Sequence, residues 1–376
     1  MKFLLIAGSP NSLINFRGHL LDALVASGLE VHAASPDLSS NSTVRYQLEE
    51  KGVHVHDIYI NRTGINPLSD IKTFLGLLLL IWQIKPDYVL GYTIKPVIYG
   101  SLAAAFVRVP NRYALITGLG YSFSDQLGSS QKQRFVRNLV ERLYRLGLRK
   151  SRKVFFQNPD DEALFREYRI IDLKVPSIVV NGSGVDTQHF APQPLPDSPR
   201  FLLIARLLAD KGIREFVDAA YIIKKTYPHV VFTLVGDIDI NPKSITRKEL
   251  DGWIKEGRID YLGKLKDVRM AIAGASVFVL PSFYREGVPR TILEALSMGR
   301  AVITTDTPGC RETVIEGVNG YLVPIKNAES LADAMKSFIE QPRNIEKMGR
   351  RSREIAEQKY DVHKVNGVML KEMGII

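Results

Sequence analysis

The sequence alternates short apolar runs with segments of helix length, and it passes through this alternation twice. In the first half the apolar runs lie at Lys2–Ala7, Glu30–Ala34, Val53–Ile58, Tyr88–Tyr92 and Arg112–Thr117. In the second half they lie at Arg200–Arg206, Val230–Gly236, Ile259–Leu262, Ser276–Pro281 and Ala301–Thr305. Such runs are typical of βαβ units, whose parallel strands are buried on both faces. The pattern therefore predicts an α/β protein with two doubly wound sheets.

A segment rich in glycine and proline separates the two halves. It contains the turn-forming stretch Asn181–Asp186 and the proline-rich stretch Ala191–Pro196. A chain of 376 residues exceeds what one core usually organises. We therefore expect one domain over residues 1–185 and a second over residues 186–376, with a last helix able to pack back on the first domain. Ligands of open α/β sheets bind beyond the carboxyl ends of the strands, so two facing sheets predict a cleft between the domains.

Composition narrows the class of protein. Cys310 is the only cysteine, which excludes an internal disulfide and a cysteine-rich metal site and fits a reducing, cytoplasmic compartment. The apolar start of the chain is too short for a signal peptide, and the longest apolar run, Phe74–Trp82, is too short to cross a bilayer. The net charge of +10 favours anionic partners: nucleic acid, anionic lipid or phosphorylated ligands.

Two cations follow the first strand of the second half. Arg206 ends that apolar run, and Lys211 comes five residues later, where a helix is expected to begin. A diphosphate is well held by a bidentate arginine and a lysine beside the free amides of a helix N-terminus. The alternative is that both residues are solvated loop charges.

Two glutamates frame a predicted loop-to-helix junction. Glu286 falls in the loop that follows an apolar strand, and Glu294 falls in the helix, with Pro289 at its expected start. In this context the two carboxylates suit ligands rich in hydroxyl groups, while Gly287 lets the backbone approach a ligand closely. The spacing of eight residues carries no weight alone, because Glu346 and Glu354 repeat it in an ordinary charged helix. The alternative is a pair of surface charges.

The order of these motifs resembles that of family 4 retaining glycosyltransferases, and the match extends over essentially the whole second half. The matching segments are residues 204–212, 234–237, 280–294 and 317–320. The resemblance implies the GT-B fold of two facing Rossmann-like domains, with no cofactor and no bound metal. It implies that Arg206 and Lys211 bind the donor diphosphate, that Glu286 contacts the hydroxyls of the donor sugar and that Glu294 binds the ribose. Gly287 and Val288 are also expected to bind the donor. Glu286, Arg206 and Lys211 are then the catalytic candidates.

Two competing ligand motifs are less favoured. Asp237-Ile238-Asp239 has the Asp-x-Asp form of a metal site in another glycosyltransferase fold, but it lies at a strand end within a repeated βα pattern. A nicotinamide site would need Gly-x-Gly-x-x-Gly after a first strand, and neither half has it. We therefore expect neither a metal nor a dinucleotide.

The first half offers candidates for binding an acceptor. A loop at residues 8–12 follows the first strand, and the helix after it carries Asn15, Arg17 and His19. Arg17 suits an acceptor phosphate, whereas His19 is either a base or a plain helix-face residue. Thr117 and Gly118 follow the fifth strand and are further candidates. Many family members have a histidine in that loop for the donor sugar; the sequence here is Thr117-Gly118-Leu119-Gly120, so that contact is not carried over.

The segment from Asn111 to Phe123 narrows the resemblance to the bacterial lipid-linked branch of the family. The most similar members transfer N-acetylgalactosamine from UDP-GalNAc to an undecaprenyl-diphosphate-linked saccharide, in O-antigen or protein-glycan assembly. This resemblance implies a UDP-sugar donor, a lipid-linked acceptor and retention of the anomeric configuration. Other UDP-hexose transferases, a UDP-sugar epimerase of similar shape and an inactive glycan-binding scaffold remain alternatives.

A strongly basic segment spans residues 132–153, in which Glu141 is the only acid. Its apolar residues fall in adjacent rows on a helix, while the charged residues project elsewhere. A basic amphipathic helix can rest on an anionic bilayer, so we expect a peripheral protein on the cytoplasmic face of the bacterial inner membrane. The alternative is a core-packing helix with a solvated basic face. Nucleic acid is disfavoured, because no stacking platform or known binding module accompanies the charge.

Overall fold

The computed structural model describes residues 1–61, 66–119, 131–239, 241 and 243–376. Contacts divide these residues into two compact units. The first unit contains Met1–Ser183 and His363–Ile376, and the second contains Gly184–Val362. The chain therefore leaves the first unit between Ser183 and Gly184 and returns to it with its last helix.

The sheet of the first unit is parallel throughout the described residues, in the order β3-β2-β1-β4-β5-β6-β7. Its strands are β1 (Lys2–Ile6), β2 (Glu30–Ser35), β3 (His54–Asp57), β4 (Tyr88–Tyr92), β5 (Asn111–Ile116), β6 (Lys153–Phe156) and β7 (Ser177–Val179). In β1, Phe3 pairs with Val31 on one side and with Tyr88 on the other. The run Phe3–Ile6 is fully buried, which explains why it lacks the polar alternation of a half-exposed strand.

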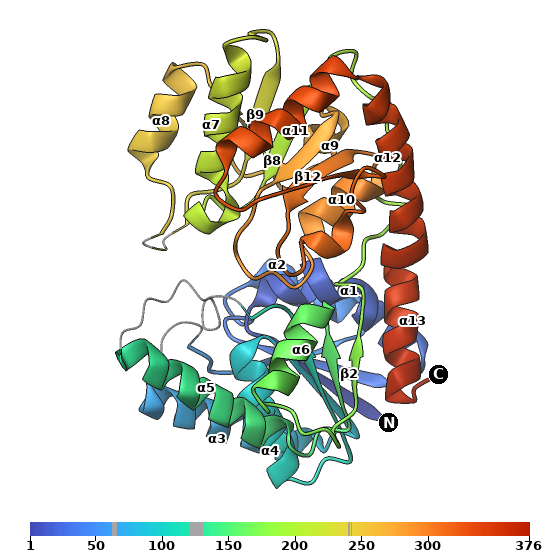
Figure 1. The fold of residues 1–376 in the computed structure, drawn as a ribbon. Coiled ribbons are helices and arrows are strands. Elements are labelled where there is room, and N and C mark those ends of the chain that lie inside the picture. Colours follow the sequence, from blue (N-terminus) through green and yellow to red (C-terminus); the bar gives the residue numbers. More distant parts are fainter. Residues whose placement is uncertain (62–65, 120–130, 240, 242) are drawn as a thin grey trace. The chain divides into compact units, whose positions relative to one another are not determined.

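Helices cover both faces of this sheet (Figure 1). One face packs against α1 (Pro10–Ala26), α2 (Ser42–Glu50) and the last helix, α13 (Val362–Met373). The other packs against α3 (Pro67–Ile84), the π-helical turn η1 (Pro96–Gly100), α4 (Ser101–Phe106), α5 (Gln131–Leu148) and α6 (Pro159–Glu167). The hydroxyl of Tyr113 on β5 donates to the carbonyl of Met373 at 2.9 Å. This bond fastens the end of α13 to the sheet.

The sheet of the second unit is also parallel within the described residues, in the order β10-β9-β8-β11-β12-β13. Its strands are β8 (Arg200–Ile204), β9 (Val231–Val235), β10 (Asp260–Tyr261), β11 (Val277–Leu280), β12 (Ala301–Thr305) and β13 (Gly320–Val323). The helices are α7 (Ile213–Lys224), α8 (Arg247–Lys255), α9 (Arg269–Ala273), α10 (Arg290–Ser297), α11 (Ala328–Glu340) and α12 (Arg343–Ile355). Short turns add η3 (Ala209–Lys211), η4 (Arg311–Thr313) and η5 (Ala356–Tyr360).

The prediction of two doubly wound sheets is confirmed, and each predicted strand overlaps an observed one. The strands β6, β7 and β13 were not predicted. The prediction of a basic helix over residues 132–153 was wrong at its carboxyl end. The helix α5 ends at Leu148, and Lys153 begins β6, because the residues that follow it, Val154–Phe156, are fully buried in the sheet.

Candidate functional site

The strand β8 lies between β9 and β11, so the connections after β8 and β11 leave neighbouring strand ends. Ligands of doubly wound sheets bind at such a change of direction. Here the two connections contact each other directly: the amides of Phe283 and Tyr284 donate to the carbonyl of Asp210 at 2.9 and 3.1 Å. Gly212 has a φ of +74°, and a Cβ at this position would lie 2.2 Å from the Pro281 carbonyl oxygen. Only glycine permits this approach.

A buried ion pair joins the two connections. The ammonium group of Lys211, after β8, donates to the Oε1 atom of Glu286, after β11. Only 12% of the Lys211 side chain and 14% of the Glu286 side chain are exposed. The hydroxyl of Ser282 donates to the same carboxylate at 3.2 Å, and the Lys211 ammonium lies 4.9 Å from the ring centre of Tyr284. Two residues that are 75 apart in sequence thus form one charged centre.

Arg206 lies beside this pair in the chain but has a different environment. Its side chain is 61% exposed, and it donates to Asp239 at 2.9 Å. Asp239 is the second aspartate of the Asp-x-Asp stretch, and its other oxygen accepts the amide of Asn241 at 2.9 Å. An exposed arginine held by one carboxylate can exchange that partner for a phosphate, since an exposed ion pair contributes little stability.

Glu294 lies on α10, the helix that follows Glu286. Its side chain is 9% exposed and accepts from Arg290 at 2.8 Å, one turn earlier on the same helix. Burial raises the pKa of Glu294, and the neighbouring Arg290 opposes that shift. Gly287 and Val288 are buried in the connection just before α10. The structure therefore joins Glu286 to Lys211 and Glu294 to Arg290, with Arg206 paired separately.

Sequence reasoning missed the residues that support Glu286 from β12. The hydroxyls of Thr305 and Thr307 donate to the carbonyl of Ser282, whose own hydroxyl donates to Glu286. Gly309, with a φ of +81°, packs its backbone against Gly287. The polar run Thr304-Thr305-Asp306-Thr307-Pro308-Gly309 after an apolar strand was the available signal. Cys310 is buried nearby, and burial raises the pKa of its thiol to about 11.

The corresponding end of the first sheet has a buried arginine packed against an aromatic ring. Arg17 is on the inner face of α1, is 2% exposed, and has its guanidinium carbon 5.2 Å from the ring centre of Tyr92 at the end of β4. Tyr92 in turn shares a 2.8 Å hydrogen bond with Ser12. Burial raises the pKa of Tyr92 to about 12, and the bond to Ser12 and the charge of Arg17 oppose that shift. The structure thus places Arg17 against the end of β4, in a cluster with Tyr92 and Ser12.

The other predicted acceptor residues lie at separate positions. Asn15 and His19 are exposed on α1, and the His19 ring meets His363 edge-on with 5.8 Å between ring centres. Thr117 and Gly118 follow β5 and are half-buried, and Gly118 has a φ of +99°. Gly120 and residues 121–123, which the resemblance also used, lie outside the described residues.

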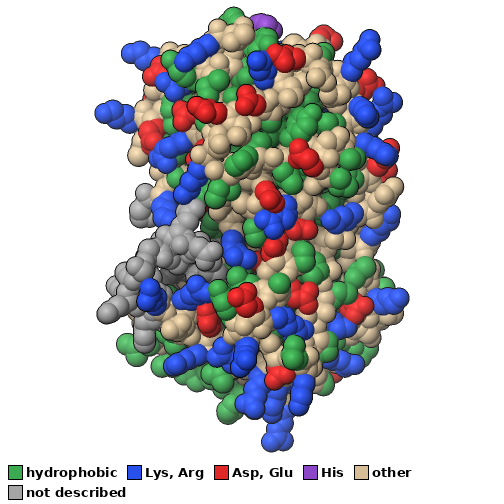
Figure 2. Space-filling view, in the orientation of Figure 1, with side chains coloured by type: hydrophobic (Ala, Val, Ile, Leu, Met, Phe, Trp, Pro, Cys, Tyr) green, Lys and Arg blue, Asp and Glu red, His purple; other side chains and the backbone are tan. Residues whose placement is uncertain are grey.

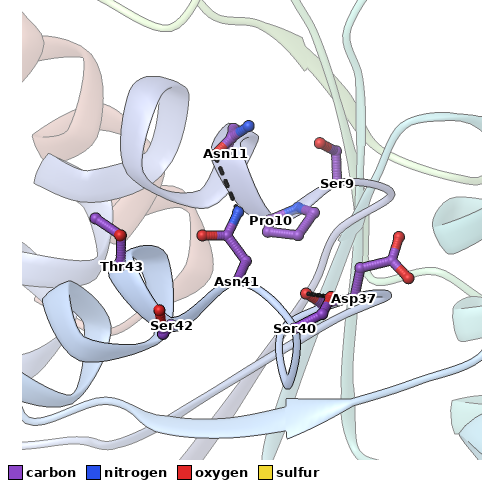
Figure 3. A pocket seen from close by; sticks show the side chains of 8 residues that line it. All are labelled: Ser9, Pro10, Asn11, Asp37, Ser40, Asn41, Ser42 and Thr43. Atoms are coloured by element: carbon purple, nitrogen blue, oxygen red, sulfur yellow. Dashed lines mark hydrogen bonds between the residues drawn. The ribbon is translucent and has the colours of Figure 1, made fainter.

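A polar pocket opens at the carboxyl ends of β1 and β2 and has a volume of about 440 Å³. It is lined by Ser9, Pro10, Asn11, Asp37, Ser40, Asn41, Ser42 and Thr43. Figure 3 shows these side chains around the amino ends of α1 and α2, where the Asn41 side-chain amide donates to the Asn11 Oδ1 atom at 3.5 Å. Asn41 also caps α2 by accepting the amide of Val44 at 3.2 Å. Asp37 to Thr43 were not predicted; the turn-rich run after β2 was the signal.

Two family models match the chain. Residues 6–158 match the model described as "Glycosyl transferase 4-like", and residues 198–341 match "Glycosyl transferases group 1". The fold agrees with solved structures of such enzymes: Anabaena HepE, crystallised with UDP, is 20% identical with a TM-score of 0.79 over 100% of both chains. Sucrose-phosphate synthase from Thermosynechococcus elongatus is 18% identical, with a TM-score of 0.77 over 99% of this chain and 98% of that one. The chain is a glycosyltransferase of the GT-B fold.

Two curated relatives of this glycosyltransferase act on lipid-linked saccharides. One is the N,N'-diacetylbacillosaminyl-diphospho-undecaprenol alpha-1,3-N-acetylgalactosaminyltransferase of Campylobacter jejuni, 28% identical over 90% of this chain and 89% of the relative. The other is the UDP-Gal:alpha-D-GlcNAc-diphosphoundecaprenol alpha-1,3-galactosyltransferase of Escherichia coli, 29% identical over 72% of this chain and 71% of the relative. This glycosyltransferase is therefore similar to enzymes of polysaccharide and glycan biosynthesis.

Two features of the described part of the glycosyltransferase concern metals and membranes. Among the described residues, no group of three or more His, Cys, Asp or Glu side chains is arranged to hold a metal ion. One described helix, α3, is long and apolar enough to cross a membrane, but 33% of its most apolar window is buried inside the protein. Its inward side chains Thr73, Leu77 and Ile81 belong to the first unit. Core helices of globular proteins can have the same length and apolar composition.

Proposed function

We propose that this enzyme transfers N-acetylgalactosamine from UDP-GalNAc to an undecaprenyl-diphosphate-linked saccharide, with retention of configuration. The second unit binds the donor and the first unit binds the acceptor. The observation that carries the proposal is the buried pair of Lys211 and Glu286 at the switch point of the second sheet, with Arg206 on the same connection. The names of the two relatives support the choice of a lipid-linked acceptor and of a hexose or N-acetylhexosamine donor.

The ion pair suits a donor that carries both a diphosphate and a sugar. When the donor binds, Lys211 exchanges the Glu286 carboxylate for a phosphate oxygen, and Glu286 is then available to accept a hydroxyl of the sugar. Arg206 exchanges Asp239 for the diphosphate in the same way, because its side chain is already exposed. One ligand thus satisfies both halves of the resting pair. Gly287 and Val288 bring backbone amides to the same position at the start of α10.

The same cations assist the chemical step. The bond between the anomeric carbon and the phosphate oxygen breaks as the acceptor hydroxyl forms a new bond to that carbon, and the hydroxyl proton passes to the departing phosphate. Negative charge grows on the diphosphate during this step, so Lys211 and Arg206 stabilise the transition state more than the ground state. Attack from the face of the leaving group retains the configuration, and no protein nucleophile takes part.

Glu294 is proposed to bind the ribose of the nucleotide. Its buried carboxylate is fixed by Arg290 on α10. A carboxylate with free lone pairs accepts hydrogen bonds from two neighbouring hydroxyls, which is the arrangement that a ribose offers. The raised pKa of Glu294 makes the bare carboxylate costly, so hydroxyl donors are favoured as partners.

Catalysis is proposed to require no metal. The charge of the diphosphate is matched by Arg206 and Lys211, and Asp239 is occupied by Arg206 and by the amide of Asn241. Turnover is therefore expected to persist in EDTA. A loss of activity in EDTA that Mg²⁺ or Mn²⁺ restores would contradict this part of the proposal.

The acceptor is assigned to the carboxyl end of the first sheet. The polar pocket lined by Ser9, Asn11 and Asn41 offers hydroxyl and amide partners for a saccharide. Arg17 supplies positive charge for the acceptor diphosphate, and Asn15, Thr117 and Gly118 complete the proposed acceptor set. Such an acceptor is membrane-bound, so we place the enzyme on the cytoplasmic face of the bacterial inner membrane. The basic residues of α5 and of the turn after it are assigned to attraction by anionic lipid, whereas Lys153 begins β6 and pairs with Glu372.

The test is a panel of UDP-sugars incubated with undecaprenyl-diphosphate-linked saccharides, with the linkage and anomeric configuration of the product determined by NMR. Transfer from UDP-GalNAc with retention supports the proposal, and Glu286→Ala should abolish transfer without unfolding the protein. Transfer from another UDP-hexose alone would change the donor. Conversion of UDP-sugar without an acceptor would indicate an epimerase, and full activity of Glu286→Ala would exclude the assigned site.

A further inference from the structure

The helix α3 is apolar on two opposite faces. Its inward face, with Thr73, Leu77, Ile81 and Ile84, packs into the core of the first unit. Its outward face bears a second apolar row at spacings of three or four residues, and each member is 50–79% exposed: Leu68, Ile71, Leu75, Leu79 and Trp82. We call these five residues the α3 stripe. This second row explains why a helix with a buried face also meets the composition of a membrane span.

Such a stripe needs an explanation. Single exposed leucines are ordinary on protein surfaces, but a continuous apolar row along a whole helix marks a contact with another apolar phase. The neighbouring helix α4, which packs against α3, ends in another exposed apolar residue, Phe106, which is 73% exposed. The part of the chain that the structure describes places no side chain over these residues deeply enough to bury them.

Charge indicates what this surface meets. The helices α3, α4 and α5 cover the same face of the first sheet. The helix α4 and the turn η1 each contact both α3 and α5. Exposed cations lie on these helices and on the turns that follow them: Lys72, Lys85, Arg108, Arg142, Arg149 and Lys150. The acids of α3 and α5 are paired, since Asp70 pairs with Lys95 at 2.7 Å and Glu141 pairs with Arg137 at 2.9 Å. Figure 2 shows hydrophobic and basic side chains gathered together at this end of the first unit.

We infer that the α3 stripe lies in the interface of an anionic bilayer, parallel to its plane, and that the basic residues around it contact lipid head groups. An apolar row flanked by Lys and Arg is the arrangement that suits an interfacial helix. A second copy of the chain fits less well, because apposed copies would bring their basic rims together. The inference rests on the proposed lipid-linked acceptor and adds to it: α3, and not α5 alone, sets how the enzyme is held at the membrane.

Tryptophan fluorescence tests insertion directly. The chain has two tryptophans, and Trp253→Phe leaves Trp82 as the only one. With vesicles of phosphatidylethanolamine and phosphatidylglycerol, we expect the Trp82 emission to shift to the blue and to be quenched by lipids brominated along the acyl chain. Vesicle binding with an unshifted and unquenched Trp82 would overturn the inference, because the protein would then dock through charge alone.

A matched set of variants tests the contribution of the stripe. Leu75→Gln/Leu79→Gln should lower the partition coefficient onto these vesicles by at least about tenfold, the effect of removing two buried leucine side chains. The controls are Tyr46→Gln on α2, on the other face of the same sheet, and Met270→Gln in the second unit; both residues are exposed, by 61% and 81%. Equal losses in the controls, or none in the double variant, would contradict the inference. Sedimentation equilibrium identifies the remaining outcome, a dimer that the double variant breaks, which also overturns it.

The activity of the same variant separates this inference from the proposed function. With an acceptor saccharide on a short, water-soluble prenyl diphosphate, Leu75→Gln/Leu79→Gln should match the wild type. With the undecaprenyl acceptor in vesicles, it should lose activity in proportion to its lost binding. Failure of every acceptor with the wild type would reject the proposed function, whereas equal activity of both proteins on vesicles would reject only the role of α3.

Discussion

The two sheets of the molecule have the same parallel construction but different chemistry at their carboxyl ends. Each unit has one well-buried Lys–carboxylate pair near its switch point: Lys95 with Asp70 in the first, and Lys211 with Glu286 in the second. In the second unit the pair joins two loops beside an exposed Arg206. In the first unit the pair ties α3 to the end of β4, and a separate pocket at the ends of β1 and β2 is lined by hydroxyls, amides and the carboxylate of Asp37. Under the proposed function, the charged loops of the second sheet bind the diphosphate and the polar pocket of the first sheet binds the saccharide.

The largest expected effect comes from neutralising the Lys211–Glu286 pair, compared with neutralising the Lys95–Asp70 pair of the first unit. Lys211→Met should lower kcat/KM about 10²–10³-fold, because an electrostatic partner of the leaving diphosphate is lost. It should also destabilise the fold by about 3–5 kcal/mol, since Glu286 remains as a buried, uncompensated charge. Lys211→Met/Glu286→Gln should recover the stability but not the activity. Steady-state kinetics and thermal unfolding of the single and double variants measure the two effects.

The matched control is Lys95→Met/Asp70→Asn, which neutralises the equally buried pair of the first unit. This variant should bind UDP as the wild type does, as measured by titration calorimetry. If it lost UDP affinity while Lys211→Met/Glu286→Gln kept it, the assignment of the donor to the second sheet would be wrong.

Alanine substitutions at Gly309 and Gly317 test how tightly the backbone after β12 packs against the loop that carries Glu286. A Cβ at position 309 would lie 1.9 Å from the Gly287 carbonyl oxygen, whereas Gly317 has a similar φ of +71° and nothing within 4 Å. Gly317→Ala should cost about 1–2 kcal/mol for its left-handed backbone. Gly309→Ala should cost about 1–3 kcal/mol more, and it should lower kcat about 10²-fold by displacing the loop of Glu286. Equal unfolding midpoints for the two variants would show that the contact is not tight.

Arg206 should contribute less than Lys211, because its side chain is 61% exposed. Arg206→Ala is expected to raise the Kd for UDP about tenfold, or about 1.4 kcal/mol. The control is Arg247→Ala, another exposed arginine that pairs with an aspartate, Asp251, at 3.0 Å. It should leave the Kd unchanged. Calorimetric titration with UDP measures the Kd of both variants. An equal Kd for Arg206→Ala and Arg247→Ala would show that Arg206 does not bind UDP.

The strands, and the presence of charged residues in the loops that follow them, could be predicted from the sequence because both rest on local pattern. Buried strands are continuous apolar runs, and Arg206, Lys211 and Glu286 stand directly after such runs. The partners of these residues could not be predicted: the pairing of Arg206 with Asp239 depends on β8 and β9 being neighbours. The short strand β7 was missed because its three residues are all only half-buried. The polar pocket was missed for a related reason, since two loops that are distant in sequence meet only once β1 and β2 pair.

Acid should affect the two units differently, which is the smallest effect expected here. On β2 and β3, burial lowers the pKa of His32, and burial together with the charges of His32 and His54 lowers the pKa of His56 to about 4; Glu30 partly opposes the shift at His32. A lowered pKa means that the unfolded chain binds protons first, so stability present above about pH 6.5 declines as the pH falls towards 4.

In the second unit the pKa shifts have a different effect on stability as the pH falls. Burial raises the pKa values of Asp210 and Glu294, so a falling pH relieves their buried charge. The bond to Arg269 lowers the pKa of Asp267 to about 2, so that contribution is lost only below about pH 4. Hydrogen exchange, corrected for intrinsic rates, should therefore show β2–β3 losing protection between pH 6.5 and 4.5 while β8–β9 keeps it. His56→Gln should reduce the difference, because the amide can preserve the hydrogen bond to His32 without titrating, whereas His229→Gln, at an exposed position of the second unit, should not. Parallel loss of protection in both sheets would show that the imidazoles of the first sheet do not set its response to acid.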